Sequence, residues 1–152
     1  MKLFLRERPD IQETEVEVRF RERNAEVENL IKAIGASSDA IPGIKENGDV
    51  EMLYMSGILF FEAVDRDVFA YKTTEVFKVR KTLYELEDFL KDKFFVRISK
   101  STIVNIKAVR SVAPEDSRRV KLLLRNGEYL IVSRNYVNDF KTAIGMKGGD
   151  GK

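Results

Sequence analysis

The stretch that decides the fold reads Phe94-Phe95-Val96-Arg97-Ile98-Ser99-Lys100-Ser101-Thr102-Ile103-Val104-Asn105. An apolar run typical of a buried strand ends in the short polar and basic segment Ser99-Lys100-Ser101, and an apolar turn then leads to Asn105. Downstream, Asn126-Gly127 is the strongest two-residue signal for a β-hairpin, and the returning strand ends in a second such segment, Ser133-Arg134-Asn135. Two strand ends are therefore predicted to present lysine and arginine, flanked by hydroxyl and amide groups, to an anionic polymer.

Composition sets the outer limits. The chain has 152 residues, enough for one domain or for one domain with a small extension. It contains no cysteine and no histidine, which excludes disulfides, thiol chemistry, histidine acid–base catalysis and most zinc sites. No apolar run approaches the ~20 residues of a membrane span, and no signal-peptide pattern opens the chain. We expect a cytoplasmic protein.

The residues that enzymes use are poorly represented. Carboxylates cluster at Asp65 and Asp67 and again at Glu85, Glu87 and Asp88, where a turn and an exposed helix face make them ordinary surface charges. Nucleophile–base pairs lack a candidate base, and no glycine-rich phosphate loop follows a strand. The sequence therefore predicts a protein that is not an enzyme and uses no cofactor, metal or small-molecule substrate.

Charge is distributed unevenly along the chain. The net charge is only +2, but residues 93–152 hold 13 basic and 5 acidic side chains, whereas residues 43–92 hold 7 and 11. Basic clustering on one part of a fold is the electrostatic footprint of nucleic-acid binding, although a solvated basic face gives the same count. The aromatic residues could stack on single-stranded bases, but most fall at inward positions, which weakens that alternative.

An N-terminal extension is predicted over residues 1–42. Apolar and charged residues alternate over Thr14–Phe20, the pattern of a half-buried strand. Asn24 is expected to cap a helix whose apolar face consists of Val27, Leu30, Ile31 and Ile34. So small a unit must pack on the rest of the chain or on a partner.

A β-rich domain is predicted over residues 43–145. Turn signals at Pro42-Gly43 and Asn47-Gly48 lie at its start, and Thr82 with Glu85 forms a capping box for a central helix. Ser133 is expected to cap a last helix, and residues 146–152 are expected to be a disordered tail. The predicted class is α+β with mostly antiparallel strands.

The order of these pieces resembles the LytTR family of bacterial DNA-binding domains over residues 45–145, about two-thirds of the chain. The similar segments are Ile58-Leu59-Phe60-Phe61-Glu62, Leu83-Tyr84-Glu85-Leu86-Glu87, Phe95-Val96-Arg97-Ile98, Ser101-Thr102-Ile103-Val104-Asn105 and Val132-Ser133-Arg134-Asn135-Tyr136. The resemblance implies that loops between strands, rather than a recognition helix, read the major groove of double-stranded DNA.

Carried over to this chain, the resemblance implies base contacts from Arg66, Lys100 and Arg134. Family members often have histidine where Ser99 stands and a basic residue where Val68 stands, so a different base preference is expected. Short hydroxyl and amide groups suit phosphate oxygens, and basic residues are expected to flank the loops. The predicted backbone contacts are Ser99, Ser101, Ser133, Asn135, Lys78, Arg80, Arg97, Lys107, Arg110 and Lys121.

The predicted function is that of a stand-alone, cytoplasmic transcription regulator that binds double-stranded DNA as two copies on a repeated site. The resemblance also implies a possible partner, because regulators of this subgroup are often encoded beside a small membrane protein. Two alternatives stay open. One is a protein-interaction module or anti-regulator that keeps the fold without binding DNA, and the other is a sensor of a small ligand, which would need a large apolar pocket.

Overall fold

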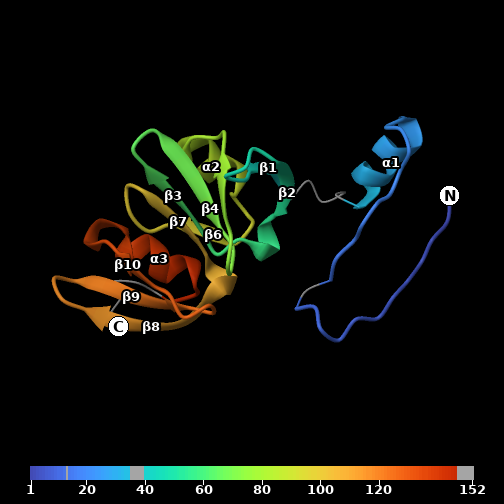
Figure 1. Cartoon of the computed structure of the whole chain (residues 1–152). Helices are drawn as coiled ribbons and strands as arrows, with labels where there is room; N and C mark the ends of the chain where they lie inside the picture. The colour runs from blue at the N-terminus through green and yellow to red at the C-terminus, as the bar shows by residue number, and fades with distance from the viewer. Residues whose placement is uncertain (13, 35–39, 147–152) are drawn as a thin grey trace. The chain divides into compact units, whose positions relative to one another are not determined.

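The computed structural model describes residues 1–12, 14–34 and 40–146. The chain divides into two units, residues 1–38 and 39–152 (Figure 1). Apart from Met146, the tail predicted to be disordered lies outside the described residues.

The N-terminal unit contains one regular element among its described residues, helix α1 (Ala25–Ile34). The predicted cap is confirmed, because the backbone N–H of Val27 donates to Oδ1 of Asn24 at 3.1 Å. The predicted strand over Thr14–Phe20 is wrong for the single chain, since that segment belongs to no β-ladder. A strand forms only where a neighbouring strand satisfies its N–H and C=O groups, and the described part of this unit offers none.

The second unit contains a seven-stranded sheet and a three-stranded sheet, and every strand pair is antiparallel. The larger sheet has the order β2-β1-β5-β4-β3-β7-β6. Its strands are β1 (Ala40–Ile44), β2 (Val50–Tyr54), β3 (Phe60–Val64), β4 (Asp67–Tyr71), β5 (Val76–Val79), β6 (Phe95–Arg97) and β7 (Thr102–Asn105). The turn predicted at Pro42-Gly43 is wrong, because both residues pair within β1, and the predicted boundary after residue 42 falls inside that strand.

The smaller sheet has the order β10-β9-β8. Its strands are β8 (Val109–Glu115), β9 (Arg119–Leu124) and β10 (Tyr129–Val132), and the hairpin predicted at Asn126-Gly127 joins the last two. Gly127 adopts φ of 92°, a conformation that favours glycine. Short 3-10 turns lie at η1 (Met55–Gly57), η2 (Ile106–Ala108) and η3 (Arg134–Tyr136), and the helices are α2 (Leu83–Phe89) and α3 (Val137–Ala143).

Both faces of the larger sheet are covered. Phe61 belongs to one buried cluster with Leu86 of α2, whereas its neighbour Phe60 belongs to a second cluster with Leu122 of β9 and Phe140 of α3. Because side chains on both faces of β3 are buried, the apolar run from Ile58 to Phe61, which enters the strand, is continuous rather than alternating. The α+β class with mostly antiparallel strands is thereby confirmed.

The predicted capping box of α2 is present. Thr82 Oγ1 accepts from the Glu85 N–H at 3.1 Å, and the Glu85 carboxylate accepts from the Thr82 N–H at 2.9 Å. The backbone hydrogen bond from Thr82 holds the pKa of Glu85 below its usual value.

The last residue of the deciding stretch is a buried structural link. The Asn105 side chain is 3% exposed. Its Nδ2 donates to the carbonyl oxygen of Ile58 at 2.8 Å, and its Oδ1 accepts from the Lys107 N–H at 3.0 Å. It therefore joins the entry of β3 to the turn that follows β7.

Candidate nucleic-acid interface

Three loops lie at one end of the second unit. Loop 1 (Asp65–Arg66) joins β3 to β4, loop 2 (Ile98–Ser101) joins β6 to β7, and loop 3 (Ser133–Asn135) follows β10. Because β7 runs antiparallel to β3, loop 1 follows the end of β3 at the place where loop 2 leads into β7. In Figure 1 the loops follow one another down the left side of the domain.

Backbone hydrogen bonds fix the loops to each other. Close to loop 1, the N–H of Ala63 donates to the carbonyl oxygen of Ser101 in loop 2 at 2.8 Å. On the other side, the N–H of Ser133 in loop 3 donates to the carbonyl oxygen of Ile98 in loop 2 at 2.9 Å. Loop 2 therefore stands between the other two and sets the position of both.

Ser133 does not cap the last helix as predicted. Its hydroxyl donates to the Ile98 carbonyl at 3.2 Å, and the chain enters α3 through the 3-10 turn η3 without a side-chain cap. The hydroxyl of Ser133 is instead engaged by the Ile98 carbonyl, which the tertiary fold brings close. A local sequence pattern does not reveal such a contact.

Arg97 holds loop 2 from inside. Its Nε donates to the Ser99 carbonyl at 2.8 Å, Nη2 donates to the Lys100 carbonyl, and Nη1 contacts Oε1 of Glu87 at 2.9 Å. Three of the five N–H donors of a guanidinium are thus used within the protein. With its backbone held by Arg97, Lys100 keeps an exposed side chain.

The serine side chains of loop 2 also face inward. Ser99 Oγ accepts from the Ser101 N–H at 3.1 Å and lies 3.3 Å from Ser101 Oγ. Both serines are half-buried, so loop 2 is ordered by its own hydroxyl groups as well as by Arg97.

Loop 1 borders a hollow of about 600 Å³ that carries mostly positive charge. Six basic residues and two acidic ones line it: Arg66, Lys78, Arg80, Lys81, Arg97 and Lys100, with Asp65 and Asp67. Asp67 is paired with Lys78 at 3.2 Å, whereas Arg66 and Arg80 are exposed. A concave surface lined by one sign of charge attracts the opposite charge, here an anion.

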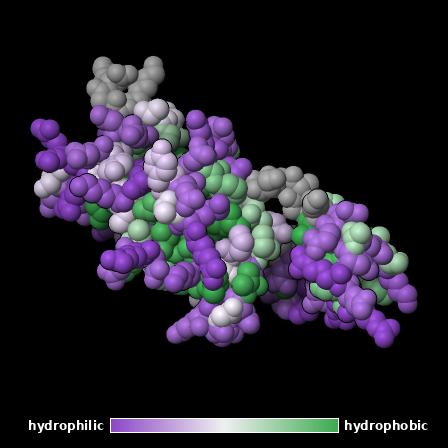
Figure 2. Space-filling model, turned by 90° about the horizontal axis from the view of Figure 1, so that it is seen from above, coloured by the Kyte–Doolittle hydropathy of each residue, from purple (hydrophilic) through white to green (hydrophobic). Residues whose placement is uncertain are grey.

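Loop 3 has a basic neighbour that the sequence analysis missed. Val132 pairs with Val120, so Arg119 at the start of β9 and Arg118 in the turn before it lie at the same end as exposed Arg134 and Asn135. The sequence could have revealed this neighbour. The Asn126-Gly127 turn sets which residues of β9 and β10 stand opposite each other, and so places the start of β9 beside the end of β10. The left part of Figure 2, the side of these loops, is largely hydrophilic.

Lys107 and Arg110 do not flank the loops, contrary to the prediction. Both follow the far end of β7, where Lys107 Nζ lies 4.5 Å from the Phe94 ring centroid. Arg110 Nη2 donates to the Arg125 carbonyl at 3.2 Å, beside the turn at the other end of β9. Lys121 stands within β9, with its Nζ 4.3 Å from the Tyr129 ring centroid. Lys107 and Arg110 lie away from loop 2 because β7 runs away from that loop. The sequence pattern alone does not show the direction of a strand.

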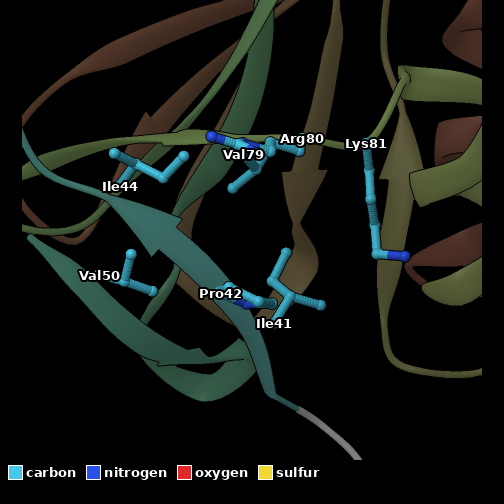
Figure 3. Close-up of a pocket in the computed structure, with 7 residues that line it drawn as sticks. All are labelled: Ile41, Pro42, Ile44, Val50, Val79, Arg80 and Lys81. Carbon is cyan, nitrogen blue, oxygen red and sulfur yellow. The ribbon is translucent and has the colours of Figure 1, made fainter. Parts of the chain in front are cut away.

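A second hollow, of about 450 Å³, opens on the larger sheet (Figure 3). Its apolar walls come from β1, β2 and β5, and its lining is Ile41, Pro42, Ile44, Val50, Val79, Arg80 and Lys81. Arg80 and Lys81 line this hollow and the basic one, so the two adjoin. Within the described ranges, no group of three acidic side chains could hold a metal ion, and no helix is long and apolar enough to cross a membrane.

The family model of the LytTr DNA-binding domain matches residues 48–145. The chain belongs to the LytTR family. An uncharacterised HTH-type transcriptional regulator of Staphylococcus aureus strain bovine RF122 / ET3-1 is 26% identical over 148 residues, 96% of this chain and 99% of that protein. The similarly named regulator of strain NCTC 8325 / PS 47 matches with the same identity and coverage.

The structural comparison shows the same fold. The LytTr DNA-binding domain of a putative methyl-accepting/DNA response regulator from Bacillus cereus superposes with a TM-score of 0.67 at 23% identity, covering 71% of this chain and 98% of that one. The relatives are named for a helix-turn-helix, a motif of two successive helices. In the described part of this chain, five strands separate α2 from α3, and β1 follows α1.

Proposed function

We propose that this LytTR protein is a sequence-specific transcription regulator that reads the major groove of double-stranded DNA through loops 1, 2 and 3. The observation that carries the proposal is the pair of backbone hydrogen bonds from Ala63 to Ser101 and from Ser133 to Ile98. They hold three loops with exposed basic side chains in one fixed arrangement. Fixed spacing between base-contacting groups is what sequence readout along a groove requires.

Each loop supplies one candidate for base contact. Arg134 and Arg66 can each donate two hydrogen bonds to O6 and N7 of guanine, and Lys100 can donate to the same acceptors. Asp65 precedes Arg66 in loop 1, and its carboxylate repels phosphates. We therefore expect loops 2 and 3 to contribute more binding free energy than loop 1.

The remaining polar residues divide by what they already contact. Lys78, Arg80 and Asn135, with Arg118 and Arg119, stand near the loops and are proposed as phosphate contacts. Arg97 is a positioning residue, because its guanidinium holds the carbonyls of loop 2. The Ser133 hydroxyl donates a hydrogen bond to the Ile98 carbonyl, and the hydroxyl groups of Ser99 and Ser101 are hydrogen-bonded to each other, so these serines order the loops. Lys107, Arg110 and Lys121 are left out of the contact surface.

The proposal includes a cytoplasmic location and binding by two copies on a repeated site. To test it, genomic fragments are selected on the immobilised full-length protein, and the enriched duplex is titrated by fluorescence anisotropy at several salt concentrations. A scrambled duplex of the same length is the control. We expect tighter binding to the enriched duplex, with log affinity falling by about 0.9 per log salt for each phosphate contact.

The alternative functions predict other outcomes. An anti-regulator that keeps the fold without binding DNA would bind neither duplex in low salt. A single-strand binder would prefer the separated strands, and a ligand sensor would show a change in duplex affinity only when metabolite extract is added.

A further inference from the structure

Residues 14–22 have the pattern of a strand but pair with no other segment among the described residues of their unit. Its sequence from residue 14 to residue 22 is Thr14-Glu15-Val16-Glu17-Val18-Arg19-Phe20-Arg21-Glu22. Val16 is 64% exposed and Phe20 is 49% exposed, a large share for apolar side chains. An unpaired strand with an exposed apolar side is a template for pairing with another chain.

The segment is complementary to itself when two copies run antiparallel with Val18 opposite Val18. In that register Glu17 of each copy faces Arg19 of the other, and Glu15 faces Arg21. On the other side, Val16 faces Phe20 in both halves of the pair. Opposite charges and apolar pairs directly across a ladder are both stabilising, and this register supplies four opposite-charge pairs and two Val16–Phe20 pairs.

Neighbouring registers keep some of these pairs but add a like-charge pair at the centre. Moving the centre to Glu17 places that carboxylate opposite its own copy, and moving it to Arg19 places two guanidinium groups together. Shifting one strand by a single residue against the other puts apolar residues opposite charged ones. A parallel in-register pair puts every charged residue opposite the same residue of the other copy. Among these registers, the one centred on Val18 brings no like charges together, and the sequence therefore favours it.

The geometry of the unit places apolar side chains of the segment beside those of α1. Val16, Val18 and Phe20 line a hollow with Val27, Leu30 and Ile34 of α1, and the charged residues between them also border it. Arg19 Nε contacts Oε2 of Glu17 at 2.6 Å, and both of these side chains are exposed and available to a second copy. Figure 2 shows apolar surface on this unit, at the right of the view.

We infer that residues 14–22 pair with the same segment of a second copy of this chain, so that the N-terminal unit is a homodimer interface with a two-fold axis at Val18. An isolated two-stranded ribbon is marginally stable in water, so the apolar side chains of α1 must cover its inner side in both copies. The interface is isologous, because the same residues meet from both partners. It would give the proposed two-copy DNA binding its contact surface, but it can be tested without DNA.

The first test exchanges the paired charges in the full-length protein. Glu17→Arg places arginine opposite arginine across the axis, and Arg19→Glu places glutamate opposite glutamate. We expect each single variant to raise the dimer dissociation constant at least about tenfold in sedimentation equilibrium, because two attractive pairs become repulsive. The double variant Glu17→Arg/Arg19→Glu restores both pairs and should recover the dimer of two 17.5 kDa chains. Glu7→Arg, an exposed change of the same kind outside the segment, is the control.

The second test uses the absence of cysteine from the chain. Residues directly opposite in an antiparallel pair have Cα atoms about 4.5–5.5 Å apart, within the range of a disulfide. Val18→Cys should therefore oxidise rapidly to a covalent dimer, whereas Glu7→Cys should not. A wild-type chain that stays monomeric at all concentrations overturns the inference, as does a folded double variant that fails to recover the dimer. Both results are independent of whether the protein binds DNA.

Discussion

The backbone N–H and the hydroxyl of Ser133 both donate to the carbonyl oxygen of Ile98, at 2.9 and 3.2 Å. The two residues are 35 positions apart and directly follow strands of different sheets, β6 and β10. Their contact ties the end of β10 to the start of loop 2, so a side chain at position 134 has a fixed place relative to one at position 100. The predictions below depend on that arrangement.

Replacing Arg134 by alanine should weaken binding to the selected duplex by about 1–3 kcal/mol, the usual contribution of one base contact. Arg110→Ala is a matched control, because it removes the same side chain at the opposite end of the smaller sheet. Titration by fluorescence anisotropy measures both variants. If a folded Arg134→Ala variant and Arg110→Ala lose the same binding free energy for the selected duplex, loop 3 makes no base contact through Arg134.

Lys100→Ala should weaken binding to the selected duplex more than to scrambled DNA, since a base contact is lost only where the correct base is present. Lys107→Ala should leave both affinities and the salt dependence nearly unchanged, because Lys107 follows the far end of β7. If Lys100→Ala weakens binding to both duplexes by the same factor and reduces the slope of log affinity against log salt by about 1, Lys100 contacts phosphate only.

Arg97→Met should weaken binding to every duplex and also lower the free energy of unfolding, because the carbonyls of Ser99 and Lys100 lose their donor. Glu87→Gln removes the ion pair to Arg97 but leaves those two hydrogen bonds in place. For this partly exposed pair we expect a loss of stability of at most about 1 kcal/mol and little change in DNA affinity. Chemical denaturation together with anisotropy separates the effects, and an Arg97→Met variant with normal affinity would rule out the positioning role.

Asn105→Ala should lower the free energy of unfolding by about 1–3 kcal/mol, because the buried Ile58 carbonyl and the Lys107 N–H lose their partner. Asn138→Ala, on the exposed surface of α3, should change it by no more than about 0.5 kcal/mol. Urea denaturation measures both. Similar midpoints for the two variants would contradict the structural role of the buried amide.

Local signals in the sequence predicted the elements that depend on local chemistry. The Asn126-Gly127 hairpin, the Thr82–Glu85 capping box and the Asn24 cap are all present, because each is decided by residues a few positions apart. The sequence also predicted where the three loops lie along the chain, because their residues are next to strand patterns.

Other features depend on what the fold brings together. The alternation over Thr14–Phe20 gives no information on whether a partner strand exists, and none is present within the described unit. Pro114 lies within β8 although proline is typical of turns, because β8 is an edge strand and tolerates a residue without an N–H. The contacts of Arg97 arise from a tight loop and a distant helix, so charge alone suggested a phosphate contact where the structure shows an internal brace.

The hydrogen bonds that join the three loops have a consequence for how such a regulator can diverge. They run between main-chain atoms of Ala63, Ser101, Ile98 and Ser133, and the side chains at 66, 100 and 134 take no part in them. Exchanging those side chains leaves the scaffold of the loops intact. Under the proposed function, operator preference can therefore be retargeted by substitution, in gene duplicates or in the laboratory, without a stability cost from broken loop-to-loop bonds.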